Sequence, residues 1–288
     1  MPRSQTNPSS SGKDRLMGDV ESQGRPADID FDRPNSARIW NYWMGGKDNY
    51  PADQAAGDAV IAVFPGITTW ARHARQFIIR SVRYMAESGV RQFLDIGTGF
   101  PTDQNTHEVA QEVTPEARIV YVDNDPVVLA HARALLTNTT NVGVTTYVDS
   151  DFRDIDRVIG MARGALNFDE PIGVMFMGSL GHVEDYDEAL AIVRSYMDAV
   201  PSGSYLAHYE AINTDPVYRQ ALDDFNAEAG AAWGYYARTP EQIGQLFDGL
   251  ELVDPGVVRL NQWRPNPAKV GNGQNIDVVS MGAVGRKP

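Results

Sequence analysis

The spacing of apolar residues along the chain changes once, near residue 90. Between residues 35 and 89, apolar side chains recur every three or four positions, as in amphipathic helices. Shorter helices are expected in SARIWNYW, which ends before Gly45 and Gly46, and between Pro51 and Pro65. The longest predicted helix lies in TTWARHARQFIIRSVRYMAESGV and ends at Gly89. This part of the chain predicts helices and no strand.

Beyond residue 89, short apolar runs alternate with helical stretches. The expected strands are QFLDI, RIVYVD, GVTTYV, IGVMFM and GSYLAHY, and the expected helices are 103–113, 126–137, 154–165, 185–199 and 215–229. Such alternation predicts βαβ units with right-handed crossovers. A further helix is expected near TPEQIGQLF. The last two apolar runs, in LELVDPGVV and IDVVSMGAV, have no helix between them, so they predict an antiparallel hairpin at the sheet edge.

The predicted fold is therefore α/β and Rossmann-like. It has a doubly wound, mostly parallel seven-stranded sheet with an antiparallel edge hairpin and a helical N-terminal cap. Residues 1–30 are rich in Ser, Pro, Gly and charge, and we expect a disordered tail. Residues 31–89 are expected to form the helical cap or lid, and residues 90–288 the α/β domain.

Composition narrows the classes of function. The net charge of −13 over 288 residues argues against nucleic acid as the partner. The absence of cysteine excludes disulfides and thiolate catalysis, and the five histidines show no paired spacing, so we expect no metal site. Without an apolar run long enough for a membrane span, we expect a cytoplasmic protein with no membrane partner. The oligomeric state stays open, with a homodimer as one option.

A glycine-rich turn, FLDIGTGFPT, follows the first predicted strand, where open parallel sheets bind ligands. A dinucleotide fingerprint needs a small residue where this chain has Thr102, and Pro101 removes a backbone donor. No lysine follows the glycines, which excludes a Walker-type phosphate loop. The carboxylate of Asp95 would repel a pyrophosphate but suits an ammonium or a sulfonium-bearing amino acid. The turn therefore favours a cationic cofactor without phosphate.

Acidic residues also end the next two predicted strands. In YVDNDP, Asp123 can accept hydrogen bonds from a ribose diol, and it is followed by Asn124. In DSDFRD, Asp151 can accept from an adenine amino group, and Phe152 offers a backbone N–H and a ring face. An amino acid, a ribose and an adenine in this order describe S-adenosylmethionine. Two alternatives stay open: Asp123 as a helix N-cap, and Asp151 as a turn residue.

The motifs GGKDN and DIGTG…YVDNDP carry a family resemblance over about residues 34–288. The chain resembles the class I S-adenosylmethionine-dependent methyltransferases and, more narrowly, an actinobacterial family of uncharacterised S-adenosylmethionine methyltransferases. The resemblance implies that Asp95, Gly97 and Gly99, with Thr98 between them, line the methionine part of the cofactor. It implies that Asp123 binds the ribose, and that Asp151 and Phe152 bind the adenine.

The GGKDN segment lies between two predicted helices. We expect this loop to fold over the carboxyl edge of the sheet and close the cofactor site. Gly45 and Gly46 permit close backbone approach, Lys47 can meet the methionine carboxylate, and Asn49 can bond polar atoms of the cofactor. The alternative is a polar loop between helices.

Helical side chains upstream of the sheet add further candidates. Arg38 and Arg75 are each suited to gripping a carboxylate through two hydrogen bonds, or are charges on a solvated helix surface. The aromatic residues Trp40, Tyr42 and Trp43 either line a substrate pocket or pack a helix face.

The chemistry is expected next to the fourth strand. Methyl transfer from a sulfonium is an in-line displacement, so an enzyme mainly aligns the reactants and excludes water. In the loop MGSLGHVEDYD, Ser179 is expected to contact the cofactor, and His182 is the best candidate for a base, or else a cap of the following helix. Second-rank candidates are His208, Tyr209 and Glu210.

The sequence thus predicts an S-adenosylmethionine-dependent methyltransferase that acts on a small-molecule acceptor. Trp233 to Tyr236 either wall an apolar acceptor or pack against a helix. One alternative is a protein that senses or sequesters S-adenosylmethionine without catalysis. A less favoured alternative is an NAD(P)-dependent oxidoreductase, against which Asp95 and Thr102 argue.

Overall fold

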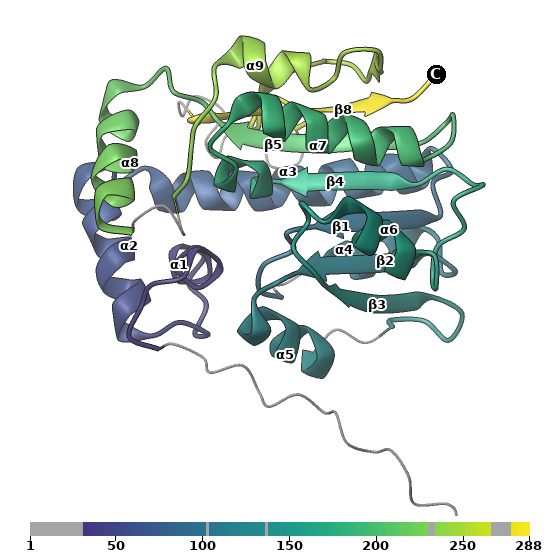
Figure 1. Cartoon of the computed structure of the whole chain (residues 1–288), viewed down its shortest axis with the longest axis horizontal. Coiled ribbons are helices and arrows are strands. Elements are labelled where there is room, and N and C mark those ends of the chain that lie inside the picture. The colour runs from purple at the N-terminus through teal and green to yellow at the C-terminus, as the bar shows by residue number, and fades with distance from the viewer. Residues whose placement is uncertain (1–30, 102–103, 136–137, 230–233, 266–277) are drawn as a thin grey trace, which may run out of the picture.

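The computed structural model describes residues 31–101, 104–135, 138–229, 234–265 and 278–288 (Figure 1). The predicted disordered tail, Thr102, Trp233 and the ends of several expected elements lie outside these residues. Within them, the chain forms one α/β body that has helices on both faces of a single sheet.

The sheet has the order β3-β2-β1-β4-β5-β8-β6, with β7 also paired to β8. Its parallel strands are β1 (Gln92–Ile96), β2 (Arg118–Asp123), β3 (Val144–Asp149), β4 (Gly173–Met177) and β5 (Tyr205–Ala211). The antiparallel part consists of β6 (Glu251–Leu252), β7 (Val258–Arg259) and β8 (Ser280–Arg286). The predicted α/β class and antiparallel edge are confirmed, and the two-residue β7 adds an eighth strand to the seven expected.

Each face of the sheet carries a helical layer. One layer consists of α3 (Ile67–Glu87), α4 (Thr106–Val113) and α5 (Pro126–Leu135), and the other of α6 (Ile155–Ala162), α7 (Tyr186–Ala199) and α9 (Pro240–Gln245). Side chains alternate between the two faces of a strand. In β1, Phe93 therefore packs in the core beneath α3, and Leu94 packs in the core on the opposite face, beneath α6 and α7. By the same alternation, Asp95 at the end of β1 faces the layer that contains α3.

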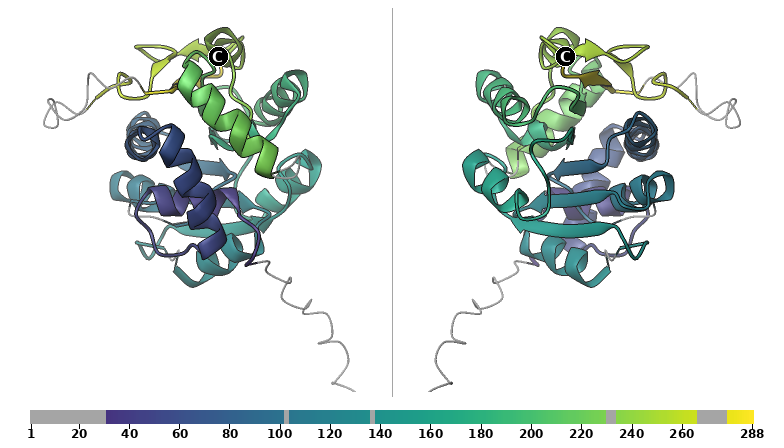
Figure 2. Two further views of the ribbon diagram at one scale, coloured as in Figure 1. Left: turned by 90° about the vertical axis from the view of Figure 1, so that its left-hand side faces the viewer. Right: turned by 90° about the vertical axis from the view of Figure 1, so that its right-hand side faces the viewer.

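Three helices cover the carboxyl ends of the parallel strands. They are α1 (Ser36–Trp43), α2 (Pro51–Val63) and α8 (Pro216–Ala229), at the left of Figure 1 and across the strand ends in Figure 2. The long helix α3, which the sequence groups with the cap, packs Phe77 and Val82 on the sheet. The helices that cover the strand ends instead include α8, which comes from the predicted α/β part of the chain and packs against α2.

A buried ion pair joins α1 to α2. Arg38 Nε lies 2.9 Å from Asp53 Oδ2, and both side chains are almost fully buried. The guanidinium of Arg38 also donates to the carbonyl oxygen of Arg33. Removing one partner of such a pair leaves a buried charge uncompensated, so the pair makes the relative position of the two helices specific. Arg38 is thus engaged within the cap and does not line the cavity described below.

Candidate functional site

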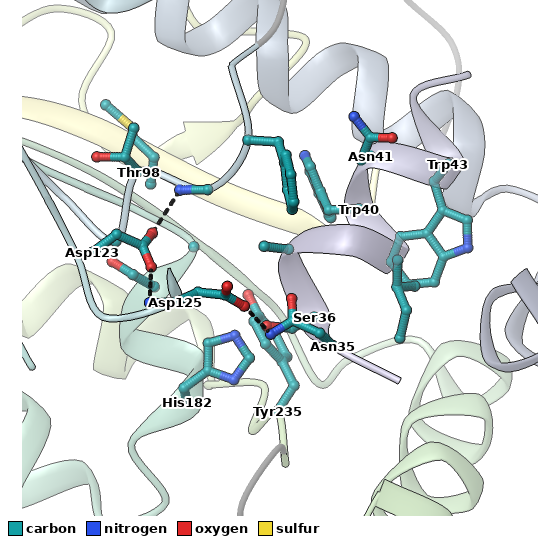
Figure 3. A pocket seen from close by; sticks show the side chains of 18 of the residues that line it. Asn35, Ser36, Trp40, Asn41, Trp43, Thr98, Asp123, Asp125, His182 and Tyr235 are labelled. Atoms are coloured by element: carbon teal, nitrogen blue, oxygen red, sulfur yellow. Dashed lines mark hydrogen bonds between the residues drawn. The ribbon is translucent and has the colours of Figure 1, made fainter. Parts of the chain in front are cut away.

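A cavity of about 420 Å³ lies between the carboxyl ends of the parallel strands and the helices that cover them. Figure 3 shows its two sides, with Asp123 at the end of β2 on one side and Trp40 and Trp43 of α1 on the other. Pockets of this size hold small molecules, and most are lined by apolar groups with a few placed polar ones. We call its strand-end side the acidic half. It contains Asp95, Gly97, Thr98, Gly99, Asp123, Asn124, Asp151, Phe152 and Ser179.

The glycine turn after β1 requires its glycines. Gly97 and Gly99 have φ of 70° and 66°, a region that side chains disfavour. A Cβ on Gly97 would lie 2.4 Å from the Cβ of Ser179. Ser179 Oγ donates to the carbonyl oxygen of Ile96 at 2.8 Å, and Thr98 Oγ1 donates to that of Asp95 at 3.0 Å. The turn and the loop after β4 therefore support one another at the cavity wall.

Asp95 and Arg75 face the cavity together. Thr106 Oγ1 donates to Asp95 Oδ2 at 2.7 Å, while burial raises the pKa of Asp95 to about 6. The positive charge of Arg75 on α3 acts in the opposite direction, and burial lowers the pKa of Arg75 itself. The guanidinium also donates to the carbonyl oxygen of Gln104. A carboxylate beside a guanidinium can bind the ammonium and carboxylate of one amino acid.

Asp123 closes the glycine turn from the next strand. Its Oδ2 accepts from the backbone N–H of Gly99 at 2.9 Å, and its Oδ1 accepts from that of Asp125 at 2.9 Å (Figure 3). Burial raises the pKa of Asp123 to about 6. The N-cap of α5 is Asp125 and not Asp123, because Asp125 Oδ1 accepts from the backbone N–H of Val127 at 2.7 Å. The N–H of Gly99 already bonds to a carboxylate, so a pyrophosphate would have to displace it.

Asp151 and Phe152 continue the acidic half beyond β3. Asp151 Oδ1 accepts from the backbone N–H of Arg153 at 2.9 Å, so Asp151 shapes a turn and lines the cavity at once. The Arg153 guanidinium lies over the ring of Phe152, 5.8 Å from its centroid. Asn124, also predicted, lines the cavity beside Asp123.

These residues fit S-adenosylmethionine. Carboxylates at three adjacent strand ends suit an ammonium, a ribose and an adenine amino group, and Arg75 suits a carboxylate. Within the described part of the glycine turn, the N–H of Gly99 is used internally and is not available to a phosphate. Among the described residues, no cluster of His, Asp and Glu has the arrangement of a metal site.

His182 ends the short 3-10 helix η1 (Ser179–His182) and lines the cavity. Its Nδ1 lies 2.9 Å from the carbonyl oxygen of Gly234, and its ring packs edge-on to Tyr235 at 5.4 Å (Figure 3). Burial lowers the pKa of His182, so the imidazole is neutral at neutral pH. The alternative role as a cap of α7 is wrong, because Asp185 caps that helix.

Two other candidates, Tyr209 and His208 on β5, lie in different surroundings. Tyr209 lines the cavity. His208 is fully buried, bonds the carbonyl oxygen of Phe176 at 3.0 Å and packs beside Phe247 in the opposite core. Burial lowers the pKa of His208 to about 3. It is therefore a core residue outside the cavity.

The GGKDN loop lies beside the cavity wall but not on it. Gly45, Gly46, Lys47 and Asn49 are absent from the lining residues, and Lys47 is exposed. The side chain of Asn41 on α1 holds the loop, because its Oδ1 accepts from the N–H of Asp48 at 3.0 Å and from Asn49 at 2.9 Å. The direct cofactor contacts expected of this loop therefore stay a prediction.

Two contacts connect the segment that covers the cavity to α5 and its N-cap, and neither was expected from the sequence. Asn35, the N-cap of α1, donates from Nδ2 to Asp125 Oδ2 at 2.5 Å (Figure 3). In the GGKDN loop, Asp48 Oδ1 lies 3.4 Å from His131 Nε2. Asn35 was detectable as a cap residue before an apolar helix, but its partner lies 90 residues away.

The other side of the cavity is walled by aromatic and aliphatic side chains, and we call it the aromatic half. It contains Trp40, Trp43, Trp70, Tyr218, Leu222 and Phe225, from α1, α3 and α8. The rings of Trp40 and Trp70 meet edge-on at 5.2 Å, and those of Trp70 and Tyr218 at 5.6 Å. Both sequence alternatives hold for Trp40 and Trp43, which pack and also line the cavity. Tyr42 instead donates to Asp58 at 2.7 Å on the exposed side.

Comparison with known proteins gives a family and two similar structures. Residues 22–288 match the model of a family described as S-adenosyl methyltransferase. A DUF574 family protein from Streptomyces avermitilis is 39% identical, with a TM-score of 0.84 over 90% of this chain and 99% of that chain. A candidate methyltransferase from Thermobifida fusca is 38% identical, with a TM-score of 0.81 over 92% and 99% of the two chains. No curated protein matches. No helix in the described part of the chain is long and apolar enough to span a membrane.

Proposed function

The chain belongs to the S-adenosyl methyltransferase family, whose cofactor is S-adenosylmethionine, and we propose that it transfers the cofactor's methyl group to a small-molecule acceptor. The observation that carries this proposal is the continuity of the cavity. One continuous cavity joins the acidic half to the aromatic half, so two ligands can meet inside it.

The acidic half holds the cofactor in this proposal. Asp95 binds the ammonium and Arg75 the carboxylate of the methionine part, and Asp123 accepts from the ribose hydroxyls beside Asn124. The adenine lies at Asp151 and Phe152. This assignment is supported by their common place on the cavity wall and by the pKa of about 6 of Asp95 and Asp123. Carboxyls that are partly protonated without ligand gain most from a cationic or hydroxyl-rich partner.

The glycine turn positions these groups. Gly97 and Gly99 bring the backbone close to the cofactor, while Thr98 and Ser179 hold the turn from either side. The cofactor supplies an activated methyl group on a sulfonium. The protein then aligns the acceptor with that group and keeps water out.

His182, the base candidate from the sequence, is proposed to contact the acceptor and orient it. A carbonyl oxygen only accepts hydrogen bonds, so the contact with Gly234 requires the proton to be on Nδ1. Nε2 then carries a lone pair, which can accept a hydrogen bond from a hydroxyl or amine of the acceptor. The GGKDN loop is not among the cofactor contacts of this proposal, because neither Lys47 nor Asn49 lines the cavity.

A small molecule suits the aromatic half better than nucleic acid does, since its wall is apolar and the chain carries a net charge of −13. We retain the expectation of a cytoplasmic protein. The oligomeric state stays open, with a homodimer as one option.

Calorimetric titration with S-adenosylhomocysteine, S-adenosylmethionine and NAD(H) tests the cofactor, and labelled S-adenosylmethionine tests transfer to a panel of phenols and amines. We expect binding of the two adenosyl compounds, no binding of NAD(H), and label in at least one acceptor. Binding of NAD(H) alone would contradict the proposal. Tight cofactor binding without transfer to any acceptor would favour the non-catalytic sensor.

A further inference from the structure

A carboxyl group is buried behind the cavity wall, next to His182. Glu210 on β5 is 0% exposed, and its Oε1 accepts a short hydrogen bond from the hydroxyl of Tyr235, which lines the cavity beside His182. Its Oε2 has no hydrogen-bond partner among the described residues. An unsatisfied buried carboxyl oxygen is costly and calls for a functional explanation.

Backbone packing fixes the pair. Gly181 approaches both members: a Cβ there would lie 2.4 Å from the Tyr235 ring and 2.9 Å from Glu210 Oε1. The backbone N–H of Tyr236 donates to the carbonyl oxygen of Gly181 at 2.7 Å, and Asn226 on α8 bonds both the N–H and the carbonyl oxygen of Tyr235. The side chain of Tyr235 is therefore held at the cavity wall, with its hydroxyl on the carboxyl of Glu210.

We infer that Tyr235 and Glu210 form a proton relay that removes the hydroxyl proton of a phenolic methyl acceptor bound in the aromatic half. The inference rests on the proposed function and names its acceptor class. Flat apolar walls favour an aromatic body, and the relay places one polar group where its hydroxyl would lie.

The electrostatic surroundings of Glu210 suit this role. Burial raises its pKa to about 8, while the Tyr235 hydroxyl and the charge of Arg238 act to lower it. The other titratable groups that interact with Glu210 are Tyr209 and Tyr218. Arg238 is held to the side by its hydrogen bonds to main-chain carbonyls of residues 183 and 184. A base of this strength matches a phenol, whereas the lowered pKa of His182 makes that imidazole a poor final proton acceptor.

The relay balances the reaction. The acceptor hydroxyl gives its proton to the oxygen of Tyr235 while the proton of Tyr235 passes to Glu210 Oε1, which becomes a neutral carboxylic acid. An electron pair of the acceptor oxygen forms the new bond to the methyl carbon. The carbon–sulfur bond breaks, and its electron pair stays on sulfur. Glu210 releases the proton to solvent after the methylated product leaves.

Proton uptake on binding of 4-nitrophenolate tests the relay without turnover. Protein saturated with S-adenosylhomocysteine is titrated at about pH 9, where Glu210 is mostly ionised, in two buffers of different ionisation enthalpy. A bound phenolate next to Tyr235 requires Glu210 to be neutral, so we expect uptake of about one proton per phenolate. The visible phenolate absorption band should persist, which shows that the proton is on the protein.

Two variants and a matched control locate that proton. Glu210→Gln keeps the shape of the side chain but cannot take up a proton, and Tyr235→Phe removes the hydroxyl that couples the charge of the bound phenolate to Glu210. Both variants should therefore bind 4-nitrophenolate without uptake. The control is Tyr236→Phe, which removes a neighbouring hydroxyl that bonds Glu184 at 3.2 Å outside the cavity, and it should retain uptake.

Failure of 4-nitrophenolate to bind, binding to wild-type protein without uptake, or uptake that persists in either variant would overturn the relay. If Glu210→Gln does not fold, the wild-type protein and Tyr235→Phe decide. Loss of S-adenosylhomocysteine binding would instead contradict the proposed function, so the two failures are distinguishable.

Discussion

The two halves of the cavity are built in different ways. In the acidic half, residues from β1, β2 and β3 meet because parallel strands end at one edge of the sheet, in the register that pairs Asp95 with Tyr121 and Asp123 with Asp149. In the aromatic half, residues from α1, α3 and α8 meet only through packing of helices far apart in the chain. The first half is fixed by local backbone order, and the second by tertiary contacts.

The halves also differ in what they offer a ligand. The acidic half presents carboxylates whose pKa is raised by burial, which is a cost in the ligand-free protein that a cationic or hydroxylated ligand relieves. The aromatic half presents mainly apolar rings, and two of its indole N–H groups are already used: Trp70 Nε1 donates to Ser280 Oγ at 2.5 Å and Trp43 Nε1 to the carbonyl oxygen of Gly57 at 3.2 Å. Affinity should therefore come from charge in one half and from area in the other.

The largest effect is expected from Asp123→Ala. It removes the proposed ribose acceptor and also releases the N–H groups of Gly99 and Asp125, so the free energy of S-adenosylhomocysteine binding should weaken by about 2–4 kcal/mol. That is roughly 30- to 1000-fold in Kd by calorimetry. The control is Asp149→Ala, an exposed carboxylate at the paired position on β3. Equal affinity of Asp123→Ala and wild-type protein would remove the ribose assignment.

The second-largest effect is expected from low pH, which should weaken the binding of S-adenosylhomocysteine in the acidic half. Asp95 and Asp123 each have a pKa of about 6, above that of an unfolded chain, so without ligand they destabilise the fold as pH rises from about 4 to 6. A bound ammonium or ribose favours the ionised form. Affinity for S-adenosylhomocysteine should thus fall about tenfold per group per pH unit below pH 6 and level off above pH 7.

Titrations from about pH 5 to pH 8 check this dependence. Asp123→Asn should show a shallower slope than wild-type protein, because one of the two groups no longer titrates. A flat profile in wild-type protein would show that neither carboxyl contacts the cofactor.

A smaller and opposite pattern is expected in the aromatic half. Phe225→Ala removes a partly buried ring on α8 and should weaken binding of 4-nitrophenol about tenfold while leaving S-adenosylhomocysteine affinity within about twofold. Val217→Ala, on the same helix but exposed, is the matched control. Equal losses for both ligands in Phe225→Ala would show that the two halves are not separate sites.

The smallest effect is expected from Lys47→Ala. Lys47 is exposed and outside the cavity lining, so its loss should change S-adenosylhomocysteine affinity by less than about twofold. A loss of tenfold or more in the same calorimetric titration would instead support direct contact with the methionine carboxylate. Ser36→Ala, at the start of α1, provides a comparison on the lining itself.

Much of the acidic half was predictable from sequence, for physical reasons that concern local order. Apolar runs that end in Asp95 and Asp123 define both the strand and the point where it stops, and parallel strands then bring these ends together. Gly97 could be identified from the sequence as a turn residue, because a backbone φ of 70° is favourable for few residues other than glycine.

The aromatic half and the contacts across the cavity were not predictable in the same way. Glu210 and Tyr235 were each candidates from the sequence, but their contact was not predictable, because it forms only where a segment after α8 returns beside Gly181. Asn41 on α1 anchors the GGKDN loop, and its position in the helical pattern does not indicate this role. The sequence left Arg38 as either a ligand contact or a solvated helix charge, and neither holds, because the side chain is buried against Asp53 of a separate helix.

A crystal structure with S-adenosylhomocysteine would show directly whether the two halves hold the cofactor and the acceptor as proposed. We expect the amino acid part between Asp95 and Arg75, ribose hydroxyls within hydrogen-bonding distance of Asp123, and the adenine at Phe152. We also expect the sulfur to face the aromatic half. A ligand bound elsewhere, or with its sulfur turned away from the aromatic half, would contradict this arrangement.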